Sequence, residues 1–377
     1  MARHGVISAD SHVTEPVDLW QERLDRGLRE RAPRVIANPG AGPRWLFTAE
    51  GAMPFPIAGG FAAGRSGQEL AEFFERGYDA ARASGWDPAL RIDDQELDGI
   101  DAEVLYPSLG MNLFAMPDAA LQRACFRVYN DWLADYCRHA PARLCGVGLV
   151  SLEELGKVEE DLDRIAAQGL RGAMIWGAPP PERPYSERSY DRFWAAAAER
   201  DLPVSLHIIA GRGRTSSRVS DVTLARSVDP GVWYMTVLHE IQESLARIVF
   251  GGVLARHPRL RIVSAENDTG WIPHFLYRMD HVFEKYGAMW SEPLPEPPSA
   301  YLRRQLFATF QDDPVGPLTH ALFGAENYMW ASDFPHSDST FPESRSWIAK
   351  NFASVPESVK RRIVCRNAAA LYGFAPD

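Results

Sequence analysis

The chain carries an aspartate and a histidine two residues apart in the segment Ala9-Asp10-Ser11-His12, directly after the β-branched run Val6-Ile7-Ser8. Because side chains alternate along a strand, Asp10 and His12 should point the same way from the strand's end, and Ser11 the other way. A carboxylate and an imidazole directed at one point suit a divalent metal such as Zn²⁺ or Mn²⁺. The triplet alone is a common pattern, so its meaning depends on what the rest of the chain brings beside it.

Three further residues with metal-binding or acid–base side chains end later apolar runs: His207, Glu266 and Asp333. If these runs are strands of one parallel barrel, their carboxyl ends meet at a single mouth. Two histidines and up to three carboxylates would then point toward one centre. Each residue alone has a structural explanation, as a core histidine, an ion-paired glutamate or a turn-capping aspartate, but their convergence favours a functional site.

Eight short apolar runs alternate with helix-like stretches along the chain. The runs cover residues 6–8, 104–107, 144–150, 172–176, 203–207, 261–266, 305–310 and 328–333. The helix-like stretches cover residues 119–139, 152–168, 190–200, 232–256, 272–286 and 316–324. Continuous apolar strands separated by helices are typical of a parallel sheet that is buried on both faces. Eight such units predict an α/β fold, a (β/α)₈ or TIM barrel, rather than a Rossmann-type sheet, for which the glycine fingerprint is missing.

The stretch 17–101 contains no clear strand–helix unit and is rich in glycine, proline, tryptophan and phenylalanine. Long connections after barrel strands lie on the catalytic face. We therefore predict a single domain over residues 1–377, in which residues 17–101 form a cap over the active site; an outer decoration is the alternative.

The composition limits the classes of partner. With 377 residues and 46% hydrophobic content the chain can bury a large core, and its net charge of −10 argues against nucleic acid and acidic membranes as partners. No apolar run approaches the roughly 20 residues of a membrane span, and no signal peptide is evident. The four cysteines lack metal-site spacing, which indicates reduced thiols. We expect a cytoplasmic enzyme with a small-molecule substrate, assembled as a homodimer or higher homo-oligomer.

The chain resembles the amidohydrolase superfamily, and within it the amidohydrolase-2 branch, which includes aminocarboxymuconate-semialdehyde decarboxylase and the resorcylate-type decarboxylases. The residues that carry this resemblance are Asp10-Ser11-His12 with Glu15-Pro16, His207, Phe250-Gly251-Gly252-Val253 through His257-Pro258-Arg259-Leu260, Glu266 through Gly270-Trp271-Ile272-Pro273, and Trp330-Ala331-Ser332-Asp333-Phe334-Pro335-His336. The resemblance implies a distorted TIM barrel with one divalent metal, Zn²⁺ first and Mn²⁺ as the alternative. Its implied ligands are Asp10, His12, His207 and Asp333.

Two positions depart from the pattern of the better-understood members. The first ligand position holds Asp10 instead of histidine or glutamate, and the sixth-strand position holds Glu266 where a histidine often stands. In the decarboxylases that histidine helps to handle the proton at the reacting carbon, so its replacement weakens a simple transfer of their mechanism. No lysine lies near Ile175-Trp176-Gly177, so the bridging carboxylated lysine of binuclear relatives is missing, which supports one metal.

The chemistry that the resemblance implies assigns catalytic roles to Asp333, Glu266 and His336. A divalent ion lowers the pKa of its water from about 15.7 to roughly 7, and Asp333 beside it would accept the proton and pass it to a leaving group. His336 and Asp338 either orient Asp333 or cap the turn. Glu15 either contacts ligand or substrate, or lies at a helix N-terminus.

The leading hypothesis is a metal-dependent hydrolase that uses metal-activated water on a small aromatic or unsaturated amide, ester, lactone or C–C bond. The first alternative is a non-oxidative decarboxylase of an aromatic or unsaturated acid, which needs a cation near the substrate carboxylate. Arg44, Arg171, Arg212 and Arg214 are open candidates for that cation. The second alternative is an inactive barrel that serves as a binding subunit.

Overall fold

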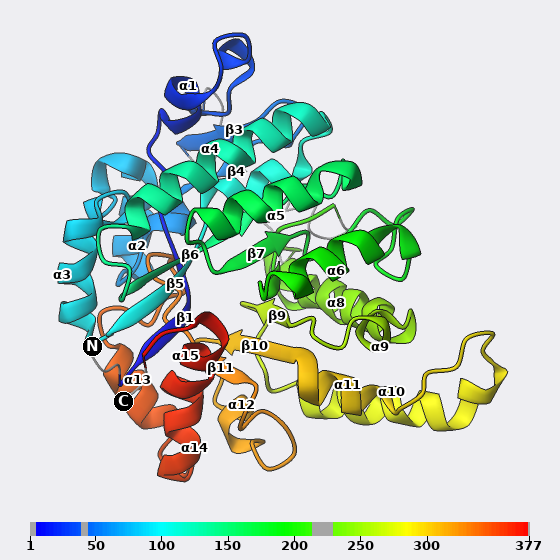
Figure 1. Ribbon diagram of the computed structural model, residues 1–377. Coiled ribbons are helices and arrows are strands. Elements are labelled where there is room, and N and C mark those ends of the chain that lie inside the picture. Colours follow the sequence, from blue (N-terminus) through cyan, green and yellow to red (C-terminus); the bar gives the residue numbers. More distant parts are fainter. Residues whose placement is uncertain (1–4, 39–43, 213–228, 376–377) are drawn as a thin grey trace.

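The computed structural model describes residues 5–38, 44–212 and 229–375. Within them, eight parallel strands form one sheet in the order β1-β5-β6-β7-β8-β9-β10-β11 (Figure 1). The strands are β1 Ile7–His12, β5 Ala102–Tyr106, β6 Leu144–Leu149, β7 Gly172–Ile175, β8 Val204–His207, β9 Ile262–Ala265, β10 Leu306–Phe310 and β11 Tyr328–Trp330. Each of the eight predicted runs overlaps one of these strands, and six of the runs contain the whole strand. The predicted (β/α)₈ barrel is confirmed.

The barrel is closed by the backbone of residues that belong to the predicted site. The N–H of Asp333, just beyond β11, donates to the carbonyl of Asp10 at 3.0 Å, and the N–H of His12 donates to the carbonyl of Phe334 at 2.6 Å. These two bonds join the first strand to the segment that follows the last one. Asp10 and Asp333, which are far apart in the chain, are therefore fixed as backbone neighbours.

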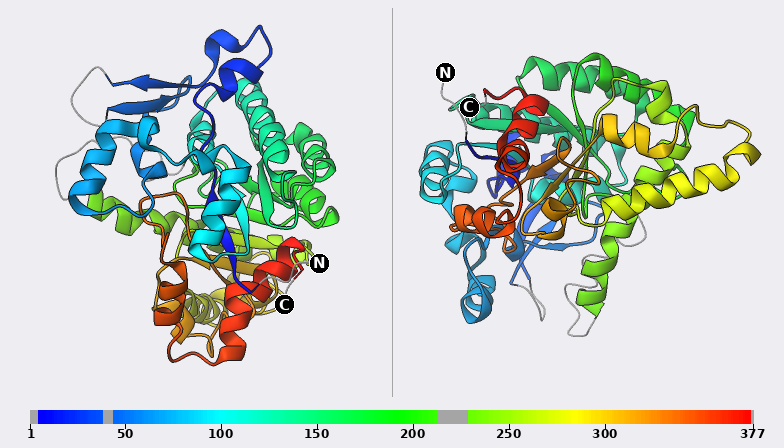
Figure 2. Two further views of the ribbon diagram at one scale, coloured as in Figure 1. Left: turned by 90° about the vertical axis from the view of Figure 1, so that its left-hand side faces the viewer. Right: turned by 90° about the horizontal axis from the view of Figure 1, so that it is seen from below.

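Helices surround the sheet, as the two views of Figure 2 show. They are α4 Ala119–Cys137, α5 Val158–Ala167, α6 Asp191–Glu199, α8 Asp229–Phe250, α9 Val253–Arg256, α10 Ile272–Tyr286, α11 Pro298–Gln305, α12 Val315–Leu318, α13 Ser344–Asn351, α14 Glu357–Arg361 and α15 Asn367–Tyr372. The predicted helix over residues 316–324 was too long, because α12 already contains Gly316 and Pro317, two poor helix formers, and turns follow it. Helix α10 projects away from the barrel at the right of Figure 1.

The connection between β1 and β5 has its own structure. It holds a three-stranded antiparallel sheet (β2 Arg34–Ala37, β3 Trp45–Thr48, β4 Phe55–Pro56) and the helices α1 Leu19–Arg23, α2 Gly67–Arg76 and α3 Pro88–Asp98. The bounds of α3 follow from its sequence, because the Asp87 side chain accepts from the N–H of Ala89, Pro88 occupies the first turn and Gly99 ends the helix in the left-handed conformation. Helix α3 leads directly into β5.

The strands of the barrel are buried on both faces, including the polar residues of β1. All six residues of β1 and all six of β6 are buried. In β6, Gly148 is required by packing, because a Cβ at this position would lie 2.7 Å from two side-chain atoms of Ile165 on α5. The four cysteines are buried and form no disulfide with a described residue. Within the described ranges, no helix has the length and apolar character to cross a membrane.

Candidate metal centre

Two histidines from opposite parts of the barrel present the same ring nitrogen to one point. The Nδ1 of His12 lies 2.7 Å from the carbonyl oxygen of Pro107, and the Nδ1 of His207 lies 3.0 Å from the carbonyl oxygen of Ile208. A carbonyl can only accept, so each Nδ1 carries a hydrogen, and in the neutral ring each Nε2 has a free lone pair. The rings are fully buried and their centroids are 5.0 Å apart. This is the orientation in which histidines bind metals.

Two aspartates stand beside these nitrogens. The Oδ1 of Asp10 lies 3.6 Å from Nε2 of both His12 and His207, and the Oδ1 of Asp333 lies 3.3 Å from Nε2 of His12. Both carboxylates are almost completely buried. Neither Nε2, nor Oδ1 of Asp10, nor either oxygen of Asp333 makes a well-directed hydrogen bond with a described residue. Buried polar atoms that converge without partners are costly, and a bound cation would satisfy them.

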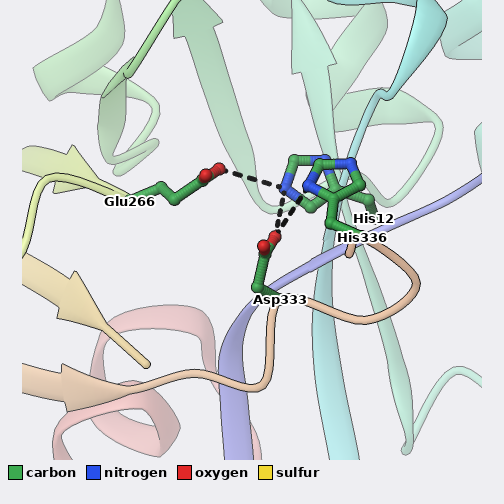
Figure 3. A group of neighbouring side chains, drawn as sticks. All are labelled: His12, Glu266, Asp333 and His336. Carbon is green, nitrogen blue, oxygen red and sulfur yellow. Dashed lines mark ion pairs between the residues drawn. The ribbon is translucent and has the colours of Figure 1, made fainter. Parts of the chain in front are cut away.

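Glu266 extends toward the same point from the end of β9 (Figure 3). Its Oε2 lies 3.4 Å from Nε2 of His207 and 3.7 Å from Nε2 of His12. Glu266 and Asp333 both adopt positive φ angles, 55° and 56°, which are uncommon for residues other than glycine. Such conformations cluster at functional sites, where the surrounding structure enforces them. The alternative that Glu266 pairs with a buried arginine is not seen among the residues that the structure describes.

His336 completes the group. Its Nδ1 lies 2.9 Å from Oδ1 of Asp333, and its ring packs against the ring of His12 with centroids 3.8 Å apart (Figure 3). We call Asp10, His12, His207, Glu266, Asp333 and His336 the histidine–carboxylate cluster. Among the described residues, two groups of side chains have ligand atoms close enough together to hold a metal ion, and the cluster contains both: His12, Glu266, Asp333 and His336, and Asp10, His12 and His207.

The protonation states of the cluster are set by burial and by its own charges. Burial lowers the pKa of His12 to about 4, helped by His336 and opposed by Asp333. Burial also acts to lower the pKa of His207, but Asp10 outweighs it and the net shift is upward. Burial raises the pKa of Glu266 well above its ordinary value, as do Asp333 and Asp10. Burial also acts to raise the pKa of Asp333, but His336 and His12 outweigh it and bring that pKa well below its usual range.

The donor set fits a divalent cation. Two imidazole nitrogens and the carboxylates of Asp10, Asp333 and Glu266 form a mixed nitrogen and oxygen set, which suits both Zn²⁺ and Mn²⁺. The set lacks thiolates, since all four cysteines lie buried away from it.

Comparison with known proteins identifies the family. A family model described as Amidohydrolase matches residues 67–374. The chain belongs to this amidohydrolase family. The resemblance drawn from the sequence is therefore confirmed, and the chain is an enzyme of the amidohydrolase superfamily.

The relatives of this amidohydrolase include proteins named as decarboxylases, one of them with bound manganese. It is 22% identical over 295 residues, 78% of each chain, to 2-amino-3-carboxymuconate-6-semialdehyde decarboxylase of Dictyostelium discoideum. An amidohydrolase from Mycobacterium avium subsp. paratuberculosis has the same fold, with a TM-score of 0.79, 22% identity and 99% of each chain covered. A point variant of 5-carboxyvanillate decarboxylase from Novosphingobium aromaticivorans, with bound manganese, has a TM-score of 0.70 and 18% identity over 98% and 97% of the two chains.

All six residues predicted for the site of this amidohydrolase lie together in the cluster, while Glu15 and Asp338 lie around it. Glu15 accepts hydrogen bonds from the N–H groups of Leu109 and Gly110, at the start of a 3₁₀ helix, so it binds backbone in this structure. Asp338 accepts a hydrogen bond from the hydroxyl of Tyr234 on α8.

The arginines proposed for a substrate carboxylate lie elsewhere. Arg44 donates to a backbone carbonyl, Arg171 precedes β7 at the end of the strand opposite to the site, and Arg212 pairs with Glu153. None of the hydrogen bonds and ion pairs that these three arginines form with described residues reaches the cluster. Arg214 lies outside the described residues.

Sequence reasoning missed two hydroxyl residues that contact the cluster. Thr309 on β10 donates to Oδ2 of Asp10 at 2.8 Å, and the hydroxyl of Ser108, after β5, lies 3.1 Å from Nε2 of His336. Thr309 could have been found, since it ends a predicted strand as the other site residues do. Ser108 gave no comparable signal, because it follows a strand to which no site residue had been assigned.

Proposed function

We propose that this amidohydrolase is a metal-dependent hydrolase of a small, uncharged aromatic or unsaturated substrate, such as an ester, lactone or amide. Asp10, His12, His207 and Asp333 would hold one divalent cation, with Zn²⁺ and Mn²⁺ both compatible. When bound, this cation would supply Lewis-acid polarisation of a substrate oxygen. The observation that carries the proposal is the position of Glu266, whose carboxylate faces both metal-binding nitrogens within 3.4 and 3.7 Å.

The chain's own acid–base groups suit the addition of water. Asp333 has two buried oxygens without well-directed hydrogen bonds, so it can accept a proton from an attacking water and deliver it to the leaving group. Glu266 offers a second carboxylate at the same centre, as a proton acceptor or as a further ligand. A histidine at this position, as in many decarboxylases, would instead favour delivery of a proton to carbon.

The charge around the site supports an uncharged substrate. Three carboxylates, Asp10, Glu266 and Asp333, face the centre, and none of them pairs with an arginine or lysine among the described residues. The carboxyl groups of Asp338 and Asp268 lie close enough to Glu266 to contribute to its raised pKa. A bound divalent cation would offset two of these charges, and the carboxylates that remain would still repel a substrate carboxylate, because like charges in a poorly solvated site repel strongly.

The cap predicted over residues 17–101 remains part of the proposal. Two backbone contacts of this segment support it, because the N–H of Ser337 donates to the carbonyl of Gly59 at 2.8 Å and the N–H of Ala63 donates to the carbonyl of Pro335 at 2.9 Å. These contacts attach the segment to the loop that carries Asp333 and His336. Its aromatic residues suit a flat, apolar substrate.

The second candidate function is metal-dependent decarboxylation of an aromatic or unsaturated acid. It is favoured by the relatives, since 2-amino-3-carboxymuconate-6-semialdehyde decarboxylase and 5-carboxyvanillate decarboxylase both carry that activity in their names. The further alternative, an inactive barrel that serves as a binding subunit, has no such support.

The two reactions are separated by their products. Metal-loaded protein is incubated with aryl esters, lactones and anilides, and separately with substituted benzoic acids, and acid release and CO₂ release are measured. We expect hydrolysis without CO₂; stoichiometric CO₂ from an acid substrate would instead establish the decarboxylase. Glu266→Gln should reduce hydrolysis at least 100-fold, as expected when a positioned acid–base group is lost. Glu284→Gln on α10 is the control for loss of a surface carboxylate, and Glu266→His tests whether a histidine shifts the enzyme toward CO₂ release.

A further inference from the structure

The loop that follows β5 contacts three residues: His12 and Glu15 of the first motif, and His336 of the loop after β11. The carbonyl of Pro107 lies 2.7 Å from Nδ1 of His12, and the hydroxyl of Ser108 lies 3.1 Å from Nε2 of His336. The next two N–H groups, those of Leu109 and Gly110, donate to the carboxylate of Glu15 at 2.9 and 2.8 Å. One four-residue loop therefore touches two members of the histidine–carboxylate cluster and is itself held by Glu15.

We propose that Ser108 is a positioning residue that orients His336 against Asp333, and that Glu15 anchors the loop that carries Ser108. This inference deepens the proposed function and rests on the same metal site. Neither Ser108 nor Glu15 is required to touch the substrate.

The hydrogen-bonding capacities of the three side chains determine how this works. An ionised carboxylate only accepts, so the 2.9 Å contact between Nδ1 of His336 and Oδ1 of Asp333 favours the tautomer in which Nδ1 carries the hydrogen, although the contact is not a well-directed hydrogen bond. In the neutral ring Nε2 is then an acceptor, and the Ser108 hydroxyl donates to it. Ser108 thereby selects one tautomer and one orientation of the ring, and the ring in turn restrains Asp333.

Burial makes this hydrogen bond hard to replace with water. Ser108 is 3% exposed and the His336 side chain 12% exposed. The His336 ring also packs against the ring of His12, so a rotation of His336 would disturb a second member of the cluster. Loss of the hydroxyl would leave Nε2 of His336 without its partner at a largely buried position, which favours a different ring state.

Glu15 fixes the loop by contacts that leave little freedom. Its carboxylate is fully buried and accepts from two successive N–H groups. Gly110 allows this approach, because a Cβ there would lie 2.9 Å from the side chain of Pro107 and 3.0 Å from Oε1 of Glu15. A movement of the loop would therefore shift the Pro107 carbonyl and the Ser108 hydroxyl together.

The tautomer of His336 can be observed directly by ¹⁵N NMR of the histidine rings, in metal-free and in zinc-loaded full-length protein. The His336 signals are assigned by their loss in His336→Gln. We expect the wild type to show one protonated nitrogen, Nδ1, and one acceptor nitrogen. Ser108→Ala should average these two signals, Ser108→Thr should restore the wild-type pattern because it keeps the hydroxyl, and Glu15→Gln should give an intermediate change.

Ser84→Ala is the matched control, because Ser84 is also a buried serine but its hydroxyl has no hydrogen-bond partner among the described residues. With a hydrolysed substrate in hand, Ser108→Ala should lower kcat about 10- to 100-fold with KM and metal content nearly unchanged. Identical His336 signals in Ser108→Ala and Ser84→Ala would overturn the inference. Because the NMR result needs neither substrate nor metal, its failure is distinct from failure of the proposed hydrolysis, which would show as a wild type without turnover.

Discussion

The hydroxyl of Thr309 on β10 donates a 2.8 Å hydrogen bond to Oδ2 of Asp10 on β1, 299 residues away in the chain. The same hydroxyl accepts a hydrogen bond of 2.8 Å from the backbone N–H of Glu266, beyond β9. One side chain thus holds residues from two other strands in place. It also leaves Oδ1 of Asp10 as the oxygen that faces the histidine nitrogens.

Thr309→Val should weaken metal binding by about 10- to 100-fold, because valine has a similar shape but cannot orient Asp10. The dissociation constant for Zn²⁺ can be measured by competition with a chelator. Thr309→Ser keeps the hydroxyl and should bind metal close to wild type. Equal affinities for the valine and serine variants would show that Thr309 does not position the ligand.

Replacement of both histidines should remove the metal. We expect purified wild-type protein to contain about one equivalent of a transition metal, as a single site of this kind holds. His12→Ala combined with His207→Ala should contain almost none, because both Nε2 donors are lost. Elemental analysis of the two proteins is the measurement, and His274→Ala on α10 serves as the control. A double variant that keeps its full metal content would place the metal elsewhere.

Asp333→Asn should abolish turnover. The change removes the proton acceptor and one carboxylate from the cluster, and a positioned acid–base group alone contributes roughly 10²- to 10⁴-fold. Turnover and metal content are measured on the same preparation, so that loss of chemistry can be told from loss of the cation. Circular dichroism checks the fold, since the Asp333 N–H closes the barrel through its backbone and not through its side chain. Turnover near the wild-type value would remove Asp333 from the mechanism.

Asp98 on α3 should make the protein less stable as pH rises. Burial raises the pKa of Asp98 from 3.8 to about 6, although Ser344 donates to both of its oxygens. Between these values the folded state binds more protons than the unfolded state, so the free energy of unfolding falls as pH increases. The contribution of this group should fall by about 2 kcal/mol between pH 4.5 and 7.5.

Asp98→Asn should remove that contribution, because asparagine stays neutral and can still contact Ser344. The difference in unfolding free energy, variant minus wild type, should therefore increase by about 2 kcal/mol over the same pH interval. Urea unfolding at the two pH values measures it. A difference that stays constant with pH would mean that Asp98 has an ordinary pKa in the folded protein.

The sequence alone predicted the barrel and the main members of the site. Buried parallel strands must be apolar on both faces, so they appear as continuous apolar runs, and eight such runs alternating with helices leave few other folds. The convergence of His207, Glu266 and Asp333 with Asp10 and His12 followed from the same rule, since the carboxyl ends of all strands meet at one mouth. The metal itself, and the roles of these residues, remain predictions.

The sequence also contained signals that were not used. Asp87-Pro88 and Gly99 mark the start and end of α3 as clearly as any motif in the chain, yet this helix lay inside a stretch read as a cap with no clear strand–helix unit. The opposite error occurs over residues 316–324, where the pattern of polar and apolar residues predicted a helix that α12 does not extend through. The low helix propensity of Gly316 and Pro317 argued against it.

Only the tertiary structure decided which groups orient the site. Ser108 reaches His336 from a position 228 residues away, and Thr309 reaches Asp10 across 299 residues. The structure also shows that Glu15 accepts from backbone N–H groups. It places Arg171 at the end of β7 opposite to the site. Local patterns predict which strand end carries a residue, because the pleat and the barrel impose a period and a direction on every strand. They do not predict which hydroxyl or carbonyl lies within 3 Å of it, because that distance depends on how separate loops pack against each other after the barrel has closed.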